Sequence, residues 1–187
     1  ALPGPERVDL GGRCVVPGFT DSHVHFATWA LAQDEVRLEG TQSLEEAVAR
    51  VREALPGWSG TWLRGRGWRS GDWSPPVEPT RHELDAIAPD RPVALMARDS
   101  HSVWLNSAAL ARADGDLRVP GGVVELDQHG EPTGVLREES CWHFRDRYIE
   151  TTDDEYVEAM RSGMKLAASR GVTAVHVPDV AFLRAQV

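Results

Sequence analysis

Two histidines separated by one residue, His23 and His25, have the types and spacing that point most directly to chemistry. They alternate with Val24 in the segment 20–26, and period-2 alternation predicts a strand with both imidazoles on one side. A neutral imidazole nitrogen is the commonest protein ligand of zinc, so two such rings could bind one ion. The spacing also fits two structural or surface histidines, and both interpretations stay open at this point.

A second set of candidate residues lies farther along the chain and could contact a substrate. Asp99 and His101 close a predicted strand, the end at which barrel loops build active sites, although hydrogen bonding within their own loop is the alternative. Trp68 and Trp73 lie in a segment rich in Gly, Arg, Ser and Pro, and they could form an aromatic wall of a substrate pocket. Packing in a hydrophobic core would explain these tryptophans equally well.

Two further residues, Glu138 and His176, each stand at the end of a predicted strand. Glu138 could approach a metal, or it could be a solvated charge, and His176 could lie near the same site. Asp21 is expected to support the histidine pair or cap the backbone, because a neighbouring carboxylate commonly orients a ligand without binding the metal.

Helices whose N-termini carry capping signals are expected to position these candidate residues. The Ser/Thr-x-x-Glu pattern, in which two side chains satisfy two backbone N–H groups, opens three predicted helices. The pairs are Ser43 with Glu46, Thr80 with Glu83 and Thr152 with Glu155. A short helix is also predicted over 106–113, and Gly171 stands where the glycine that follows a helix belongs.

Predicted strands alternate with these helices. They cover 13–16, 92–97, 122–126, 134–138 and 172–177, and the segments 122–126 and 134–138 are expected to pair across a polar turn. Residues 58–79 are expected to form an aromatic-lined loop. A long helix followed directly by a β-branched strand is typical of a parallel α/β fold.

Composition excludes several classes of function. The chain of 187 residues carries a formal charge of -9, which argues against nucleic acid, because that binding depends on Lys and Arg. No apolar run approaches the roughly 20 residues needed to span a bilayer, and the first residues lack the pattern of a signal peptide. Two cysteines make no disulfide framework. We therefore expect a cytoplasmic enzyme with no membrane or nucleic-acid partner.

The segment 17–25, which reads Pro-Gly-Phe-Thr-Asp-Ser-His-Val-His, resembles the motif that opens the catalytic barrel in the amidohydrolase superfamily. Further segments, in the same order, resemble its family 3 branch of YtcJ-like and N-substituted formamide deformylase-like proteins. They are Gly67-Trp68, Pro79-Thr80-Arg81, Leu84-Asp85, Pro89-Asp90-Arg91-Pro92-Val93, His101 with Trp104-Leu105-Asn106-Ser107, Gly130-Glu131-Pro132-Thr133-Gly134 and Gly171-Val172-Thr173.

The resemblance implies an α/β fold, namely an incomplete (β/α)8 TIM barrel of the metal-dependent hydrolase type with an α+β insertion after the first barrel strand. Residues 1–18 would connect from a small β-sandwich, and 19–30 would hold the first barrel strand with its metal motif. Residues 31–150 would form the insertion and following strands, and 151–187 a barrel helix and strand, where the chain is truncated. A complete barrel needs about 250 residues.

The resemblance also implies the chemistry. His23 and His25 would be metal ligands, and the complete enzyme would hold one or two divalent ions, with zinc expected. A lysine, two more histidines and a catalytic aspartate would lie beyond Val187. A metal-activated water would hydrolyse the C–N bond of a small amide, formamide or cyclic amide.

Other functions stay open on the same scaffold. Deamination and ester hydrolysis use related chemistry, and a non-catalytic binding protein or an inactive truncated homologue would keep the fold. Two departures from the family pattern are Asp99-Ser100-His101, where Asp-Gly-His is usual, and Val177-Pro178-Asp179 after His176. The 187-residue chain alone is expected to show no turnover and to leave strand edges unpaired, which a homo-oligomer would cover.

Overall fold

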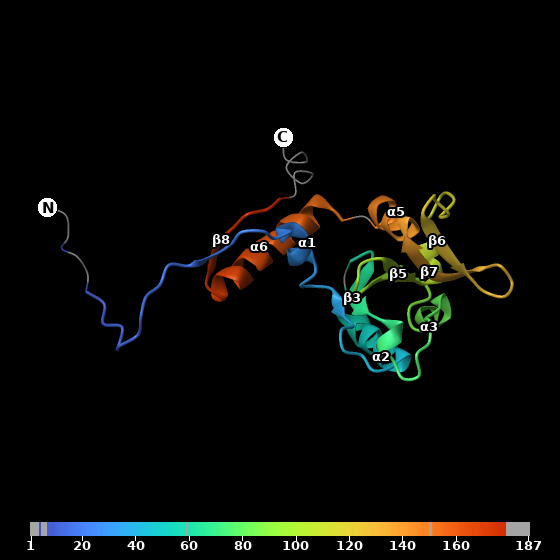
Figure 1. The fold of residues 1–187 in the computed structure, drawn as a ribbon, viewed down its shortest axis with the longest axis horizontal. Helices are drawn as coiled ribbons and strands as arrows, with labels where there is room; N and C mark the ends of the chain where they lie inside the picture. The colour runs from blue at the N-terminus through green and yellow to red at the C-terminus, as the bar shows by residue number, and fades with distance from the viewer. Residues whose placement is uncertain (1–3, 5–6, 59, 150, 179–187) are drawn as a thin grey trace.

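The structure, a computed structural model, describes residues 4, 7–58, 60–149 and 151–178 and contains two separate β-sheets (Figure 1). The first is a parallel pair, β1 (Phe19–Asp21) and β8 (Val172–Val175). The second has six strands in the order β2-β3-β4-β5-β7-β6. In the described part of the chain, no helix is long and apolar enough to cross a membrane.

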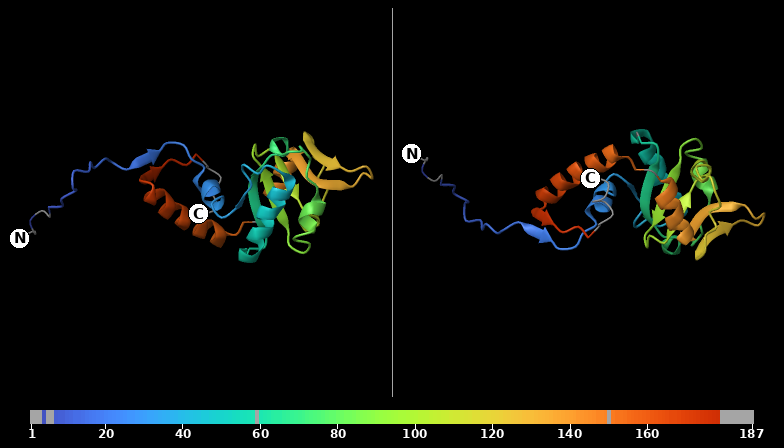
Figure 2. Two further views of the ribbon diagram at one scale, coloured as in Figure 1. Left: turned by 90° about the horizontal axis from the view of Figure 1, so that it is seen from below. Right: turned by 90° about the horizontal axis from the view of Figure 1, so that it is seen from above.

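Helices α1 (Phe26–Leu31) and α6 (Asp153–Ser169) pack against each other beside the β1–β8 pair (Figures 1 and 2). A small residue permits their close approach, because a Cβ atom on Gly163 would lie 2.9 Å from the Cβ atom of Ala30. The capping box predicted at Thr152 is present, and Gly171 follows the helix with a φ of +83°. This contact holds α1, and with it the segment that carries His23 and His25, against the chain that returns to β8.

The six-stranded sheet is half parallel and half antiparallel. Strands β2 (Val36–Arg37), β3 (Leu63–Trp68) and β4 (Val93–Ala97) are parallel to one another. Strands β5 (Ser102–Leu105), β7 (Pro132–Glu138) and β6 (Gly122–Leu126) continue the sheet, each antiparallel to its neighbour. The predicted pairing of the strands around 122–126 and 134–138 is therefore confirmed.

Short helices connect these strands. They are α2 (Leu44–Ala54), α3 (Arg81–Asp85), α4 (Ser107–Leu110) and α5 (Glu139–Tyr148), with 3-10 turns at Leu55–Gly57 and Ser70–Asp72. The box at Thr80 is complete, but the one predicted at Ser43 is only half formed. Ser43 accepts from the N–H of Glu46, whereas the Glu46 carboxylate accepts from the N–H of Gln42 at 2.7 Å.

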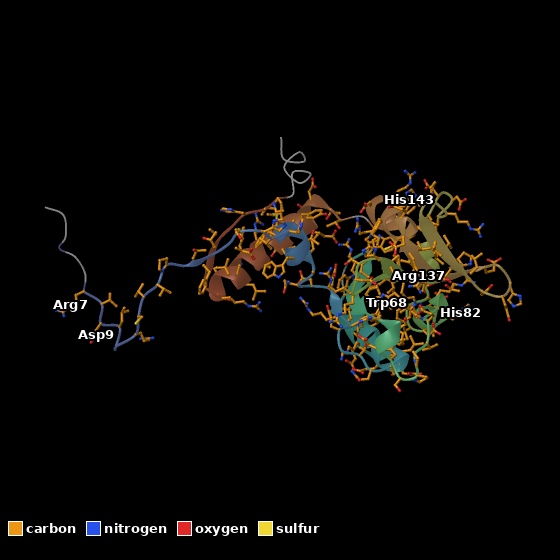
Figure 3. All side chains as sticks on the ribbon, viewed as in Figure 1. Arg7, Asp9, Trp68, His82, Arg137 and His143 are labelled. Atoms are coloured by element: carbon orange, nitrogen blue, oxygen red, sulfur yellow. The ribbon has the colours of Figure 1, made fainter. Side chains whose placement is uncertain are left out.

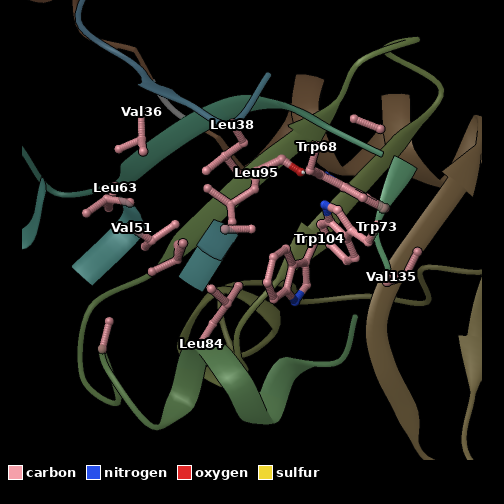
Figure 4. Close-up of a cluster of buried hydrophobic side chains, with 14 residues drawn as sticks. Val36, Leu38, Val51, Leu63, Trp68, Trp73, Leu84, Leu95, Trp104 and Val135 are labelled. Atoms are coloured by element: carbon pink, nitrogen blue, oxygen red, sulfur yellow. Dashed lines mark hydrogen bonds between the residues drawn. The ribbon is translucent and has the colours of Figure 1, made fainter. Parts of the chain in front are cut away.

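Hydrophobic side chains cover both faces of the six-stranded sheet. On one face, α2 and α3 pack over a core that contains Trp68, Trp73 and Trp104 (Figure 4). The centroids of these three indole rings lie 6.2 to 6.4 Å apart. On the other face, α5 packs against β6 and β7, and its Phe144 is fully buried in a cluster with side chains of β4, β5 and β7. The tryptophans of the segment 58–79 thus belong to the core rather than to a loop.

The expectation of a loop over 58–79 is wrong because β3 lies inside it. A bulge between Arg66 and Trp68, with Gly67 at a φ of +93°, turns Trp68 to the face that already carries Leu63. Gly65 fits closely, since a Cβ atom there would lie 2.9 Å from the carbonyl oxygen of Val36. The bulge breaks the period-2 pattern and the glycines remove side chains, so the strand has no apolar alternation to detect.

Two other predicted strands are also corrected. Residues 13–16 form no regular structure, and Val15 and Val16 are exposed, with no strand of the described chain beside them to supply hydrogen bonds. The strand expected over 20–26 ends at Asp21, because its side chain accepts from the N–H of His23 at 3.0 Å and turns the backbone. The two histidines follow the strand rather than alternate along it.

The described residues form no closed barrel, since the β1–β8 pair and the six-stranded sheet are separate. The chain is a mixed α/β protein in which all helices and strands from β2 to α5 lie in sequence between α1 and α6. Asp179, noted above for its departure from the family pattern, lies outside the described residues with the rest of 179–187.

The contact at Gly163 gives a prediction on stability. A Gly163→Val substitution would force α6 away from Ala30, and we expect the free energy of unfolding to fall by about 1–3 kcal/mol in urea denaturation. Ser162→Val, at the exposed neighbouring position, is the control and should change it by less than about 0.5 kcal/mol. Equal effects of the two substitutions would show that α1 and α6 do not pack closely.

Candidate functional site

Three histidines lie at one edge of the β1–β8 pair. Because the two strands are parallel, their carboxyl ends meet at the same edge, and His23, His25 and His176 all follow these ends. Backbone hydrogen bonds continue the pairing past the strands: the N–H of His176 donates to Asp21 at 2.8 Å, and the N–H of Val24 donates to His176 at 3.1 Å. The structure therefore brings His176 to the segment that carries the predicted metal ligands.

The rings of His23 and His25 lie close to each other. Their ring centroids lie 5.5 Å apart, with the ring planes at 79°. A zinc–nitrogen bond of about 2.0–2.1 Å puts an ion about 3.2 Å from the centroid of a ligating ring, so the separation of the two centroids is within the span of one shared ion. Both side chains are exposed, as is that of His176.

The histidine pair alone does not complete a metal site. Within the described ranges, no group of three or more His, Cys, Asp or Glu side chains is placed to hold a metal ion. Catalytic zinc sites use three protein ligands and leave one position for water. His23 and His25 would therefore contribute two ligands of a larger set.

Three other predicted residues, Asp99, His101 and Glu138, form a second cluster. Glu138 Oε2 lies 2.8 Å from His101 Nδ1, and the N–H of Glu138 donates to the carbonyl oxygen of His101 at 2.8 Å. Asp99 Oδ1 accepts from the N–H of His101 at 2.9 Å. These residues lie in the β4–β5 hairpin and at the end of β7, so His101 follows a hairpin turn rather than a parallel strand.

Backbone strain is concentrated in this cluster. Ser100 and Glu138, with φ values of +63° and +52°, are the only non-glycine residues of the described chain in the left-handed region. Such residues cost on the order of 1–3 kcal/mol each and occur preferentially at functional sites. Trp142 helps to hold the turn, because its indole N–H donates to the carbonyl oxygen of Ser100 and its ring lies 5.0 Å from that of His101. Sequence reasoning missed Trp142, because nothing in its local pattern links it to residue 100.

The charge of Glu138 changes the acidity of His101. The pKa of His101 is raised above its usual value, first by the hydrogen bond to Glu138 and then by the negative charges of Glu138 and Asp99. Because Glu138 occupies Nδ1, Nε2 is the ring nitrogen left for another partner.

Trp68 and Trp73, which were candidates for the wall of a substrate pocket, are buried in the hydrophobic core. Trp68 and Trp73 are 2% and 3% exposed, and their indole N–H groups donate to the Leu95 carbonyl oxygen and to the Thr41 hydroxyl. Core packing, the alternative left open by the sequence, accounts for both. The edge of Trp68 also lines a hollow of about 570 Å³ together with Asp99 and Arg137. Figure 3 shows Trp68 and Arg137 within the six-stranded sheet and its helices.

A larger cavity of about 740 Å³ lies where α1 meets the six-stranded sheet. Thr28 and Leu31 of α1 line it, which places the cavity beside the helix that starts directly after His25. Ser100, the neighbour of His101, lines it as well. Sequence reasoning missed this cavity, although the alternation of Arg64 and Arg66 along one strand could have indicated a charged face.

The His101–Glu138 pair gives a testable pKa. We expect Glu138→Gln to lower the pKa of His101 toward its usual value of 6.5, as measured by NMR titration of the imidazole. Since the folded-state pKa is raised, the pair stabilises the fold below the unfolded pKa, and this contribution is lost as the pH rises through the folded pKa. The variant should thus lose more stability at pH 5.5 than at pH 9.

Glu139→Gln provides a matched control, because it removes the same charge at the adjacent exposed position without touching His101. It should leave the pKa of His101 within about 0.3 of that of the unchanged protein, since an exposed charge without contact is largely screened. A fall of equal size in both variants would show that the hydrogen bond at 2.8 Å does not control this pKa.

Comparison with known proteins agrees with the histidine motif. Residues 6–186 match the model of the Amidohydrolase family. The chain is 32% identical to the YtcJ protein of Bacillus subtilis, with 96% of this chain and 35% of that protein covered. It is 33% identical to an N-substituted formamide deformylase of Arthrobacter pascens, with 94% of this chain and 34% of that protein covered.

The structure also resembles a solved one. An uncharacterized metal-dependent hydrolase from Pyrococcus furiosus superposes with a TM-score of 0.67 at 30% identity, covering 85% of this chain and 31% of that one. The chain thus spans about a third of the length of the relatives it matches. A family match over nearly all of its residues, together with the histidine motif at a parallel strand end, shows that the chain belongs to the amidohydrolase family.

Proposed function

We propose that this chain is part of a metal-dependent hydrolase that cleaves a non-peptide C–N bond in a small amide, formamide or cyclic amide. The observation that carries the proposal is the placement of His23 and His25, with ring centroids 5.5 Å apart, at the carboxyl edge of a parallel strand pair. This edge is where α/β enzymes build active sites. Family membership and the likeness to a formamide deformylase support the choice of a C–N bond.

In this proposal, β1 and β8 are the first two strands of a (β/α)8 barrel, and α6 is the helix that leads into the second. Residues 31–150 are the insertion and its strands, and residues 1–18 lead from a β-sandwich. The exposed apolar side chain of Phe19 supports this assignment, since β8 is the only strand that pairs with β1 among the described residues. Additional barrel strands would bury such side chains.

The residues of this chain have distinct roles in the proposed site. His23 and His25 would hold a divalent ion, with zinc expected because imidazole suits it. The ion, when bound, supplies a water acidified to a pKa near 7. Asp21 fixes the turn before His23 through its hydrogen bond at 3.0 Å. His101, whose protonated form Glu138 favours, donates a hydrogen bond from Nε2 to an acceptor on the substrate.

The proposal predicts that hydrolytic activity requires both a bound metal ion and the histidine pair. The complete protein that contains this chain, loaded with zinc, should hydrolyse members of a panel of N-alkylformamides, cyclic imides and N-acyl amines, and chelation should abolish the activity. His23→Asn and His25→Asn should each reduce kcat/KM by on the order of 100-fold or more, because even residues that only orient a ligand are worth 10–100-fold. His82→Asn, at an exposed position on α3, is the control and should change kcat/KM by less than about twofold.

Binding of zinc to residues 1–187 alone should be weak and without turnover, because two ligands are too few for a catalytic site. NMR signals of the His23 and His25 rings should move on addition of zinc, and those of His82 should not. A complete protein that binds zinc through these residues and hydrolyses none of the panel would favour a non-catalytic binding protein. Full activity after chelation, or in both asparagine variants, would refute the metal-dependent reaction.

A further inference from the structure

The turn between β4 and β5 has a strained backbone that other parts of the chain must stabilise. Ser100, with a φ of +63°, lies in this turn, and its N–H donates to the carbonyl oxygen of Ala97 at 3.0 Å. A serine is strained in the left-handed region because its Cβ atom crowds the backbone, whereas a glycine would not be. Contacts from outside the turn therefore have to offset this cost.

One such contact comes from α5. The indole N–H of Trp142 donates to the carbonyl oxygen of Ser100 at 3.0 Å, across 42 residues of sequence. Two other side chains of this helix, Cys141 and Phe144, are fully buried in a cluster with side chains of β4, β5 and β7. Because these core contacts fix the rotation of α5 about its axis, the indole of Trp142 is held at the turn.

The start of α5 supplies a second contact. Strand β7 ends at Glu138 and α5 begins at Glu139, so the chain passes from strand to helix without a loop, through the positive φ of Glu138. The residue before a helix commonly caps it with its side chain. Glu138 makes no such hydrogen bond, and its Oε2 lies 2.8 Å from His101 Nδ1 instead.

Both strained residues thus act on the side chain of His101. Ser100 precedes it in the turn, and Glu138 lies across the β5–β7 pair, where its N–H donates to the carbonyl oxygen of His101 at 2.8 Å. The ring of Trp142 lies 5.0 Å from that of His101 at an angle of 67°, which is an edge-to-face contact. The side chain of His101 is still 51% exposed, so these contacts orient the ring without burying it.

We propose that Trp142 is a positioning residue for His101: by binding the carbonyl oxygen of Ser100, it keeps the turn in the conformation that brings the His101 ring to Glu138. Without the indole N–H, Ser100 would relax toward a negative φ, and this rotation would move the residue that follows it. The inference rests on the proposed function in one respect, since His101 is there a donor to the substrate. The contact between His101 and Glu138 itself can be measured without any reaction.

The first test follows the pKa of His101 by NMR titration of the imidazole in the 187-residue chain. Trp142→Phe keeps an aromatic ring and removes the N–H, and it should lower this pKa toward 6.5, because the ring moves away from the carboxylates of Glu138 and Asp99. The fall should be comparable to that produced by Glu138→Gln. Adding Ser100→Gly to Trp142→Phe should restore most of the pKa, because glycine adopts a positive φ without strain.

Trp104→Phe is the matched control. The indole N–H of Trp104 donates to the carbonyl oxygen of Thr80 at 2.6 Å, and its ring lies in the core on the other face of the sheet. This variant loses the same kind of hydrogen bond, but it should leave the pKa of His101 unchanged. Should Trp142→Phe fail to fold, benzothienylalanine at position 142 takes its place, since it keeps the shape of the indole and lacks the N–H.

Three results would overturn the positioning role. They are an unchanged pKa of His101 in a folded variant at position 142, an equal fall in Trp104→Phe, and no recovery when Ser100→Gly is added. Each of them would show that Trp142 acts only through packing.

Kinetics of the complete protein that contains this chain provide a second readout. Trp142→Phe should lower kcat/KM about tenfold or more, because a small misplacement of a group that contacts the substrate is costly. The alkaline limb of the pH profile should move to lower pH, since Nε2 carries a proton only in the protonated ring while Nδ1 donates to Glu138. Ser100→Gly, added to Trp142→Phe, should reverse both changes.

The outcome separates this inference from the proposed function. A His101 pKa that depends on Trp142, in a protein whose complete form hydrolyses no amide, would support the positioning role and reject the hydrolase. Hydrolysis that depends on His23, together with a His101 pKa that Trp142→Phe leaves unchanged, would support the hydrolase and reject the positioning role.

Discussion

The parallel pairing of β1 with β8 is the constraint on which the rest of the structure depends. It joins two segments from opposite ends of the described chain, and it places the segment 22–25 and His176 at one edge. The packing of α1 on α6 reinforces it, because Gly163 lets the two helices approach closely. Since α1 begins directly after His25, this contact fixes the position of the histidine pair as well as the helix.

The candidate functional residues of the described chain lie in separate clusters. The histidine pair lies at an exposed edge of the β1–β8 pair. His101 is held by two carboxylates, which favour its protonated form and make it a hydrogen-bond donor.

The sequence predicts the elements whose local signals are complete. Capped helices and β-branched strands, such as α6 and β8, occur where predicted, because caps and periodicity are local. Strand β3 was not predictable, since the bulge at Gly67 breaks its alternation and the tertiary fold supplies its hydrophobic face. Among candidate residues, His101 and Glu138 could be named separately. Their contact across 37 residues of sequence could not be predicted, because it depends on how β5 pairs with β7.

Topology explains where the six-stranded sheet lies relative to the histidine segment. The chain leaves β1 at its carboxyl end, passes His23 and His25, forms α1 and then builds the whole six-stranded sheet. It returns through α6, which leads back to the start of β8 because β8 is parallel to β1. The segment between α1 and α6 must therefore emerge at the carboxyl edge of the strand pair. The cavity lined by Thr28 and Leu31 of α1 lies at this junction, because α1 is the element that joins the histidine segment to the six-stranded sheet.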